Sequence, residues 1–113
     1  MSRLDAVNKK TILDAEPVIG NLITKSISVG DSEGGYAAQL IWENGSTPSM
    51  VVKLEASLDG INFVEIDQQT VTGVSGTELW DVSNTYVECI RFNIVHTSGS
   101  ADITILFSGK ARH

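Results

Sequence analysis

The chain has 113 residues and a formal net charge of -6, which fits one domain with a modest hydrophobic core. Between residues 17 and 108 only Lys25, Lys53 and Arg91 accompany eleven acidic residues, so we expect no binding to nucleic acid, whose phosphates attract Lys and Arg. Cys89 is the only cysteine, which excludes an internal disulfide. The sequence has no signal-peptide pattern and no long apolar run, so we expect neither secretion by a signal peptide nor a membrane span.

The first 20 residues differ in pattern from the rest. Val7, Ile12 and Leu13 give this segment some apolar spacing, and Pro17 and Gly20 end the segment before the strands begin. We therefore predict an N-terminal arm or short helix over residues 1–20 and a β-sandwich domain over residues 21–113. An arm outside the core would dock on a neighbouring subunit through its apolar side chains, which are Leu4, Val7, Ile12, Leu13, Val18 and Ile19.

From residue 21 onward apolar residues recur with the period of two that is typical of strands. Ile23, Ile27 and Val29 are expected on one face of a first strand, which the loop GDSEGG ends. In the next strand Tyr36 and Trp42 lie in register with Ala38 and Leu40, on the same face of the strand, which predicts that both are buried. The loop NGSTP then ends that strand.

The stretch ASLDGINFVEI, residues 56–66, places Asp59-Gly60 between two apolar runs. Asp-Gly is a preferred pair for a two-residue type I′ turn, which matches the twist of paired strands. The sequence therefore predicts a hairpin with residues 50–58 on one arm and 61–66 on the other.

Further strands are expected over residues 69–74 and 77–82, and the strongest late pair over 86–96 and 101–108, joined by TSGS. The late pair carries matching apolar faces, which consist of Ile90, Phe92, Ile94, Ile103, Ile105 and Phe107. About eight short strands without a helix after residue 20 predict an all-β fold, an antiparallel β-sandwich of jelly-roll type.

Catalytic and metal-binding patterns are weak. His96 lies at a strand end, and Ser75 in GVSGT lacks the strand-turn-helix context of a nucleophile elbow. Asp31 and Glu33, with Asp59 or Asp102 nearby, would supply oxygen ligands, but no calcium-loop motif accompanies them. We therefore expect no enzyme, no catalytic residues, no metal and no cofactor.

Aromatic residues offer one alternative. Trp80 is flanked by charged residues in ELWDV, and with Tyr86 it would form a flat platform on which sugar rings stack. The alternative function is therefore a carbohydrate-binding β-sandwich module of a phage tail fibre or a cell-surface adhesin, with a glycan as its ligand. Cys89 lies in a strand of alternating polarity, where it is expected to be a small packing residue.

Over residues 36–110 the chain carries YAAQLIWENG, VKLEASLDGINFVEI, ELWDVSNTYVECIRFNIV and SADITILFSGK. This succession resembles small virion structural proteins of tailed bacteriophages. The resemblance implies a β-sandwich that decorates or cements a capsid, or forms part of a tail or fibre. It implies as partners the major capsid protein or other virion proteins, a location in the virion and a homo-oligomer, since repeated contacts with a lattice supply avidity.

Overall fold

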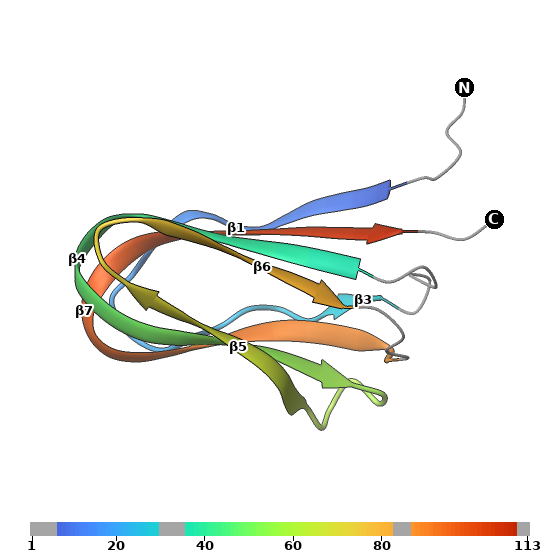
Figure 1. The fold of residues 1–113 in the computed structure, drawn as a ribbon. Coiled ribbons are helices and arrows are strands. Elements are labelled where there is room, and N and C mark those ends of the chain that lie inside the picture. Colours follow the sequence, from blue (N-terminus) through green and yellow to red (C-terminus); the bar gives the residue numbers. More distant parts are fainter. Residues whose placement is uncertain (1–6, 30–35, 83–86, 111–113) are drawn as a thin grey trace.

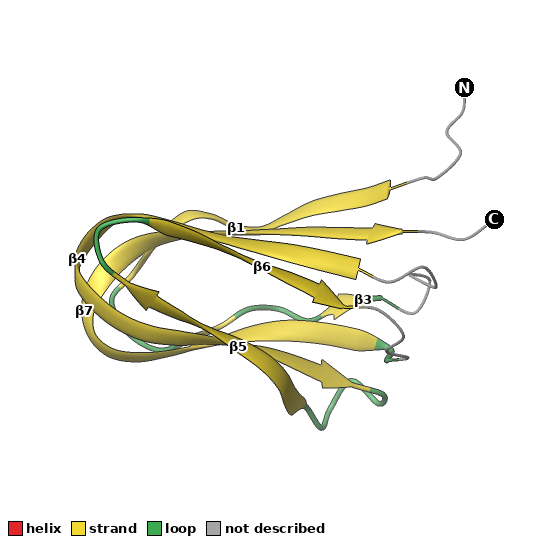
Figure 2. Cartoon of the chain, viewed as in Figure 1, coloured by secondary structure: helices red, strands yellow, loops and turns green. Residues whose placement is uncertain are grey.

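The computed structural model describes residues 7–29, 36–82 and 87–110. Within these ranges every regular element is a strand, and all strand pairs are antiparallel (Figure 2). This confirms the prediction of an all-β fold. No helix in the described part of the chain has the length and apolar character needed to cross a membrane.

The strands differ greatly in length. The two longest each have 22 residues, and each runs through both layers of the molecule. In chain order the elements are β1 (Val7–Val18), β2 (Leu22–Ile23), β3 (Ile27–Ser28), β4 (Tyr36–Ser57), β5 (Val64–Thr72), β6 (Gly76–Val82) and β7 (Cys89–Lys110).

A single sheet folds over on itself into two layers, because β4 and β7 bend together at the same end of the molecule (Figure 1). In one layer β1 pairs with residues 101–110 of β7, which pair with residues 36–43 of β4, which pair with β6. In the other layer β2 and β3 pair with residues 89–96 of β7, which pair with residues 49–57 of β4, which pair with β5. The fold is thus sandwich-like, as predicted.

The core lies between the layers and follows the period of two. Residues of β4 alternate between buried and partly exposed, so that one face of each half-strand points inward. Burial of Tyr36 and Trp42 is confirmed, as is burial of the two apolar faces of β7. Each large side chain buried in this way stabilises the fold by roughly 1.5 to 3 kcal/mol. The largest fully buried side chains are Trp80, Phe92, Leu40, Met50, Leu54, Ile90, Ile94, Ile103 and Ile105.

The predicted loops NGSTP and TSGS are the bends of β4 and β7 instead of separators between paired strands. Asn44 and Thr47 have positive φ angles of 54° and 43°, and Gly99 has a φ of 76°. The register between β4 and β7 shifts through this region, where the two paired strands bend side by side. Residues 86–96 and 101–108 were predicted to pair with each other. In the structure residues 89–96 and 101–108 belong to the two halves of β7, which lie in opposite layers.

The prediction of an arm or short helix is wrong for residues 7–18, which form the edge strand β1. The register of β1 shifts between Thr11 and Leu13 and again between Leu13 and Glu16. These irregularities break the alternation of apolar and polar residues, so the sequence does not show a strand there. Pro17 is compatible with this position because an edge strand has one side without ladder hydrogen bonds.

The predicted hairpin exists, but its turn is longer than a type I′ turn. Strand β5 begins at Val64, so residues 58–63 form the loop, and β5 also includes most of the separate strand expected over residues 69–74. Type I′ requires a positive φ at both central residues. Gly60 has a φ of 77°, whereas Asp59 is not among the residues with positive φ.

The first predicted strand, which was to carry Ile23, Ile27 and Val29 on one face, also differs from the structure. Only the two-residue elements β2 and β3 form there. Val29 is buried and Ile27 partly buried, but Ile23 is exposed. The three residues therefore do not share one buried face. The loop GDSEGG that should follow lies outside the described residues.

Candidate interaction surface

The carboxylate of Asp59 organises the loop between β4 and β5. Its Oδ1 accepts hydrogen bonds of 2.8 Å from the backbone N–H groups of Ile61 and Asn62, and another of 2.8 Å from the Ser57 hydroxyl. Oδ2 accepts a hydrogen bond from the side-chain amide of Asn62 at 2.8 Å. These bonds, with the backbone N–H of Asn62 contributing most, hold the pKa of Asp59 well below its usual range. The loop is therefore fixed by an ionised side chain that belongs to the loop itself.

Four large apolar side chains lie exposed around this fixed loop. The exposed fractions are 70% for Leu58, 79% for Ile61, 66% for Val64 and 41% for Ile66. We call these four residues the hairpin patch. Single exposed apolar residues are common on soluble proteins, but a group of them on one rigid element is typical of a binding surface.

A hollow of about 360 Å³ lies beside the hairpin patch. Its lining includes Leu58, Val64 and Ile66 of the patch, and Ala56 and Val87 supply further apolar wall. Val87 is partly buried against the core, so the hollow continues the core outward at this end of the sandwich. A hollow of this composition can receive an apolar side chain from a partner.

Arg91 ties the same loop to the sheet from the opposite face of β4. Its Nε lies 2.7 Å from Oε1 of Glu55, and its guanidinium carbon lies 4.0 Å from the centre of the Phe63 ring. Asn93 donates a second hydrogen bond to Glu55, at 3.1 Å. Burial raises the pKa of Glu55, but the bonds from Arg91 and Asn93 and the charges of Arg91 and Lys53 outweigh it, so the pKa is lowered overall. Phe63 is thereby clamped, which stiffens the loop that carries the patch.

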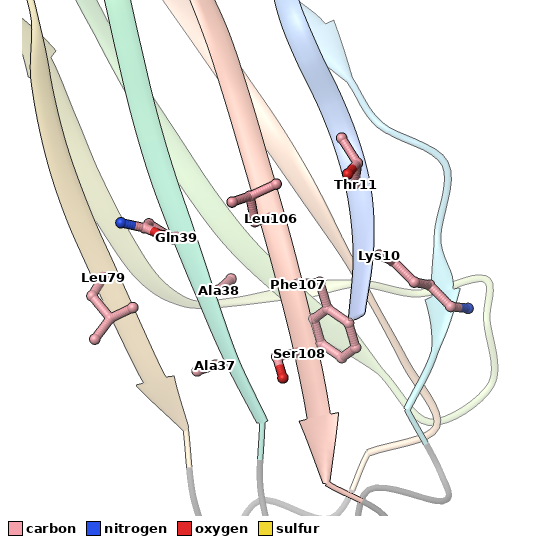
Figure 3. A pocket seen from close by; sticks show the side chains of 9 residues that line it. All are labelled: Lys10, Thr11, Ala37, Ala38, Gln39, Leu79, Leu106, Phe107 and Ser108. Carbon is pink, nitrogen blue, oxygen red and sulfur yellow. The ribbon is translucent and has the colours of Figure 1, made fainter. Parts of the chain in front are cut away.

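A second surface, the outer groove, crosses β1, β7, β4 and β6 on the outside of the other layer (Figure 3). It has a volume of about 380 Å³, and its lining is mostly apolar or small. The lining residues are Lys10, Thr11, Ala37, Ala38, Gln39, Leu79, Leu106, Phe107 and Ser108. This set contains no histidine, cysteine or carboxylate, so the groove suits contact with apolar side chains and does not supply an acid–base pair.

The sugar platform predicted at Trp80 is wrong, because Trp80 is only 1% exposed. Its ring packs against Phe92 with 5.3 Å between the ring centroids. Trp80 lies opposite Ala38 in the β4–β6 ladder and points into the core, despite the charged residues beside it in the sequence. Tyr86, the other predicted platform residue, lies outside the described residues.

Three of the six predicted arm residues pack within the chain. Val18 is buried, and Ile12 and Leu13 pack partly buried against the core. Ile19 is exposed. Val7 is in β1, and Leu4 lies outside the described residues. The side chains of this set that the structure describes, those of Ile12, Leu13, Val18 and Ile19, do not come together as a docking surface.

Three polar residues considered for chemistry, Asp59, His96 and Asp102, make structural hydrogen bonds. Nε2 of His96 lies 2.7 Å from the carbonyl oxygen of Gly99, within the bend of β7. Asp102 accepts a hydrogen bond of 2.8 Å from the Asn44 side chain. No group of three or more potential metal ligands occurs among the residues in the described ranges. Asp31 and Glu33 are outside those ranges.

The hairpin patch was not identified from the sequence. Its signal is the presence of Leu58 and Ile61 immediately beside Asp59-Gly60, at positions where a turn normally carries polar residues. Apolar residues at the tip of a hairpin lie too far out to be buried in the core between the two layers. Their occurrence at such a position therefore indicates a surface contact.

No protein-family model and no curated protein matches this chain by sequence. Solved structures show the fold. The SPBc2 prophage-derived protein YomS is similar over 96% of this chain and 100% of its own, with a TM-score of 0.60 and 12% identity. A chain in the structure of infectious bursal disease virus, Gx strain, is similar over 95% of this chain and 33% of its own, with a TM-score of 0.58 and 12% identity.

At 12% identity both likenesses concern the fold alone. The match to the prophage-derived protein covers all of its solved chain. In the viral structure the same fold occupies about a third of a longer chain. The two-layered sheet described above is therefore a known arrangement.

Proposed function

We propose that this chain is a non-enzymatic structural protein of a bacteriophage particle, and specifically a decoration or stabilising protein that binds the head lattice as a symmetric oligomer. Its partner would be the major capsid protein or another virion protein, and its place of action the virion. No cofactor or metal takes part in such a role.

The observation that carries the proposal is the hairpin patch. It presents Leu58 and Ile61 on a loop, and Val64 at the start of β5, where Asp59 and the Phe63–Arg91 contact already fix the loop. A preorganised apolar surface loses little conformational entropy on binding, so more of its contact energy appears as affinity. Such a surface favours a permanent protein partner over a small polar ligand.

The fold supports the same proposal. The sheet has eight segments in chain order when β4 and β7 are each divided at the bend and β2 and β3 are counted as one segment. The strand order of one layer is then first, eighth, third, sixth. The other layer runs second, seventh, fourth, fifth. We interpret this order as a jelly roll, an architecture that recurs in viral capsid and lectin domains. The likeness to a prophage-derived protein and to part of a virus chain agrees with that interpretation.

The modest size of the hairpin patch suits a lattice. A standard protein interface buries about 800 Å² on each partner, and four exposed side chains with one hollow are the centre of such an interface and not its whole. On a capsid, many copies bind equivalent sites, and linkage between copies raises the overall avidity above the affinity of one contact.

The carbohydrate-binding alternative has lost Trp80, one of the two residues predicted to form its platform, and Tyr86 lies outside the described residues. A stacking platform requires an exposed ring face, and Trp80 is buried. We therefore do not retain this function as a second proposal.

The first experiment is to purify the particles of the phage or prophage that encodes the chain and to measure its copy number by quantitative mass spectrometry. We expect a stoichiometry that is a fixed ratio to the major capsid protein. Absence of the chain from purified particles would contradict the proposal.

The second experiment compares Val64→Asp with Val74→Asp in particle binding. The two valines have similar exposed fractions, 66% and 69%, but Val74 lies in the turn between β5 and β6, away from the hairpin patch. We expect Val64→Asp to reduce occupancy at least tenfold, because a charge would be desolvated at the contact. Val74→Asp should bind like wild type, and equal losses in both variants would remove the hairpin patch from the proposal.

A further inference from the structure

The two-layered sheet ends in several edge strands, and three of these edges are interrupted. β1 has two register shifts and contains Pro17. β2 and β3 have only two residues each. β5 has a register shift at which Ile66 has no partner in β4, since Glu55 pairs with Glu65 and Leu54 with Asp67. Short strands, bulges and proline are the devices by which natural sheets prevent edge-to-edge pairing.

β6 is different. All seven of its residues, Gly76–Val82, pair with Trp42 to Tyr36 of β4 in a register without any shift. Among the described residues no strand pairs with the other side of β6. In Figure 1 it lies at the front of the molecule, along the margin of its layer. A regular, unpaired edge of this length is a template for another strand.

We infer that β6 pairs with β6 of a second copy of this chain, antiparallel and centred on Leu79, to form a two-fold symmetric dimer. The charge pattern of β6, which has two carboxylates and no cation, permits this occupant in one register. In that register Glu78 lies opposite Trp80 of the second copy, and Asp81 lies opposite Thr77, so that no two carboxylates are directly opposed. A two-fold interface requires this self-complementarity, because each residue meets the same surface on the other copy.

The outer groove supports the same register. Leu79 is 60% exposed and lines the groove together with Gln39 and Leu106 (Figure 3). Centring the pair on Leu79 brings the two Leu79 side chains side by side on the outer face and joins the grooves of the two copies. The dimer thus covers exposed apolar surface while it completes the hydrogen-bonding of both edges.

This inference deepens the proposed function, since it assigns the surface through which the symmetric oligomer forms. Its failure can be distinguished from failure of that function. Dimerisation is measured on the isolated chain in solution, whereas the function is measured by occupancy on particles. The dimer surface also lies in a different layer from the hairpin patch.

The first test is a pair of charge variants at Thr77, analysed by sedimentation equilibrium of the full chain at low salt. Thr77→Lys places a cation opposite Asp81 of the other copy twice in each dimer, and Thr77→Glu places an anion there twice. Since a cross-strand pair is worth about 0.2 to 1 kcal/mol, we expect roughly 2- to 30-fold tighter dimerisation for the first variant and a comparable weakening for the second. Equal dissociation constants for the two variants would overturn the register.

The second test is cross-linking at the two-fold axis. In a Cys89→Ser background, Leu79→Cys should form a disulfide-linked dimer under mild oxidation, because directly opposite residues in an antiparallel pair lie close enough for this bond. Leu58→Cys in the same background is the matched control and should stay unlinked. Cross-linking only at residue 58, or a wild-type chain that stays monomeric at millimolar concentration, would overturn the inference. The inference would also be overturned if the chain is monomeric at every concentration and Leu79→Lys nevertheless loses binding to particles. In that case β6 would pair with a strand of a different protein.

Discussion

The two ends of the sandwich are stabilised in different ways. At the end where β4 and β7 bend, backbone groups approach so closely that they leave no room for side-chain atoms. A Cβ added at Gly45 would lie 2.2 Å from the carbonyl oxygen of Gly73, and one at Gly99 would lie 2.2 Å from that of Thr47. At the hairpin end a single carboxylate, that of Asp59, orders the loop and leaves apolar side chains outside.

This difference separates folding from binding. Backbone contacts at the bend are available only to the chain itself, so substitutions there should reduce stability. The hairpin patch contributes little to its own core, and substitutions there should reduce binding and spare the fold.

The largest effect is expected for Gly99→Ala. Its φ of 76° is strained for alanine, and the new Cβ would also push against the Thr47 carbonyl group. We expect the free energy of unfolding to fall by about 3 kcal/mol or more, measured by urea denaturation.

Two further glycines serve as controls for that variant. Gly73 has a φ of 82°, but a Cβ there meets nothing within 4 Å, so Gly73→Ala should cost only about 1 to 2 kcal/mol of backbone strain. Gly20 has neither constraint, and Gly20→Ala should leave stability unchanged or raise it by up to about 1 kcal/mol. Equal losses in the free energy of unfolding at all three positions would mean that the close backbone contacts do not fix the conformation of the bend.

A smaller effect is expected at the hairpin end for Arg91→Met, which keeps most of the aliphatic stem but removes the hydrogen bond to Glu55. We expect a loss of about 1 to 2 kcal/mol in the free energy of unfolding, because Glu55 then faces Glu65 across the ladder without Arg91 beside it. Lys53→Met is the matched control. Its 3.5 Å pair with Glu65 is more exposed, so the loss should be about 0.5 kcal/mol or less. A larger loss for Lys53→Met would contradict this ranking.

The smallest effect on stability should be the pH-dependent contribution of Asp59. Its pKa is lower in the folded state than the usual 3.8, so its hydrogen bonds stabilise the fold fully above that usual value. The contribution is lost as the pH falls through the folded pKa. Asp59→Asn should therefore have a lower thermal midpoint than wild type at pH 7, and the gap should narrow below about pH 3. A gap that is constant from pH 7 to pH 2 would show that the ionised form of Asp59 does not hold the loop.

Much of the fold was predictable from the sequence because period-two patterns survive wherever the strands are regular. Ile90, Phe92 and Ile94 alternate with partly or fully exposed neighbours, and the structure buries all three. The pattern fails where bulges occur. In β1 the register shifts around Leu13 hide a twelve-residue strand, which therefore resembled an arm.

The candidate site was less predictable than the fold. Local charge suggested that Trp80 was outside, but the side of the strand on which it lies is decided by its register with Ala38. The exposure of Leu58 and Ile61 depends on the length of the loop, and Asp59-Gly60 alone suggested a turn of two residues. Hydrogen bonds that the Asp59 carboxylate accepts from Asn62 determine the longer loop, and such contacts are not visible as a periodic pattern.

The most direct test of the separation between binding and folding surfaces is hydrogen exchange of the chain, free and bound to its phage particles. We predict that the amides of residues 58–66 gain protection on binding, while those of the bend over residues 44–49 exchange at the same rates in both states. Protection that appears at the bend and leaves the hairpin unchanged would contradict the account.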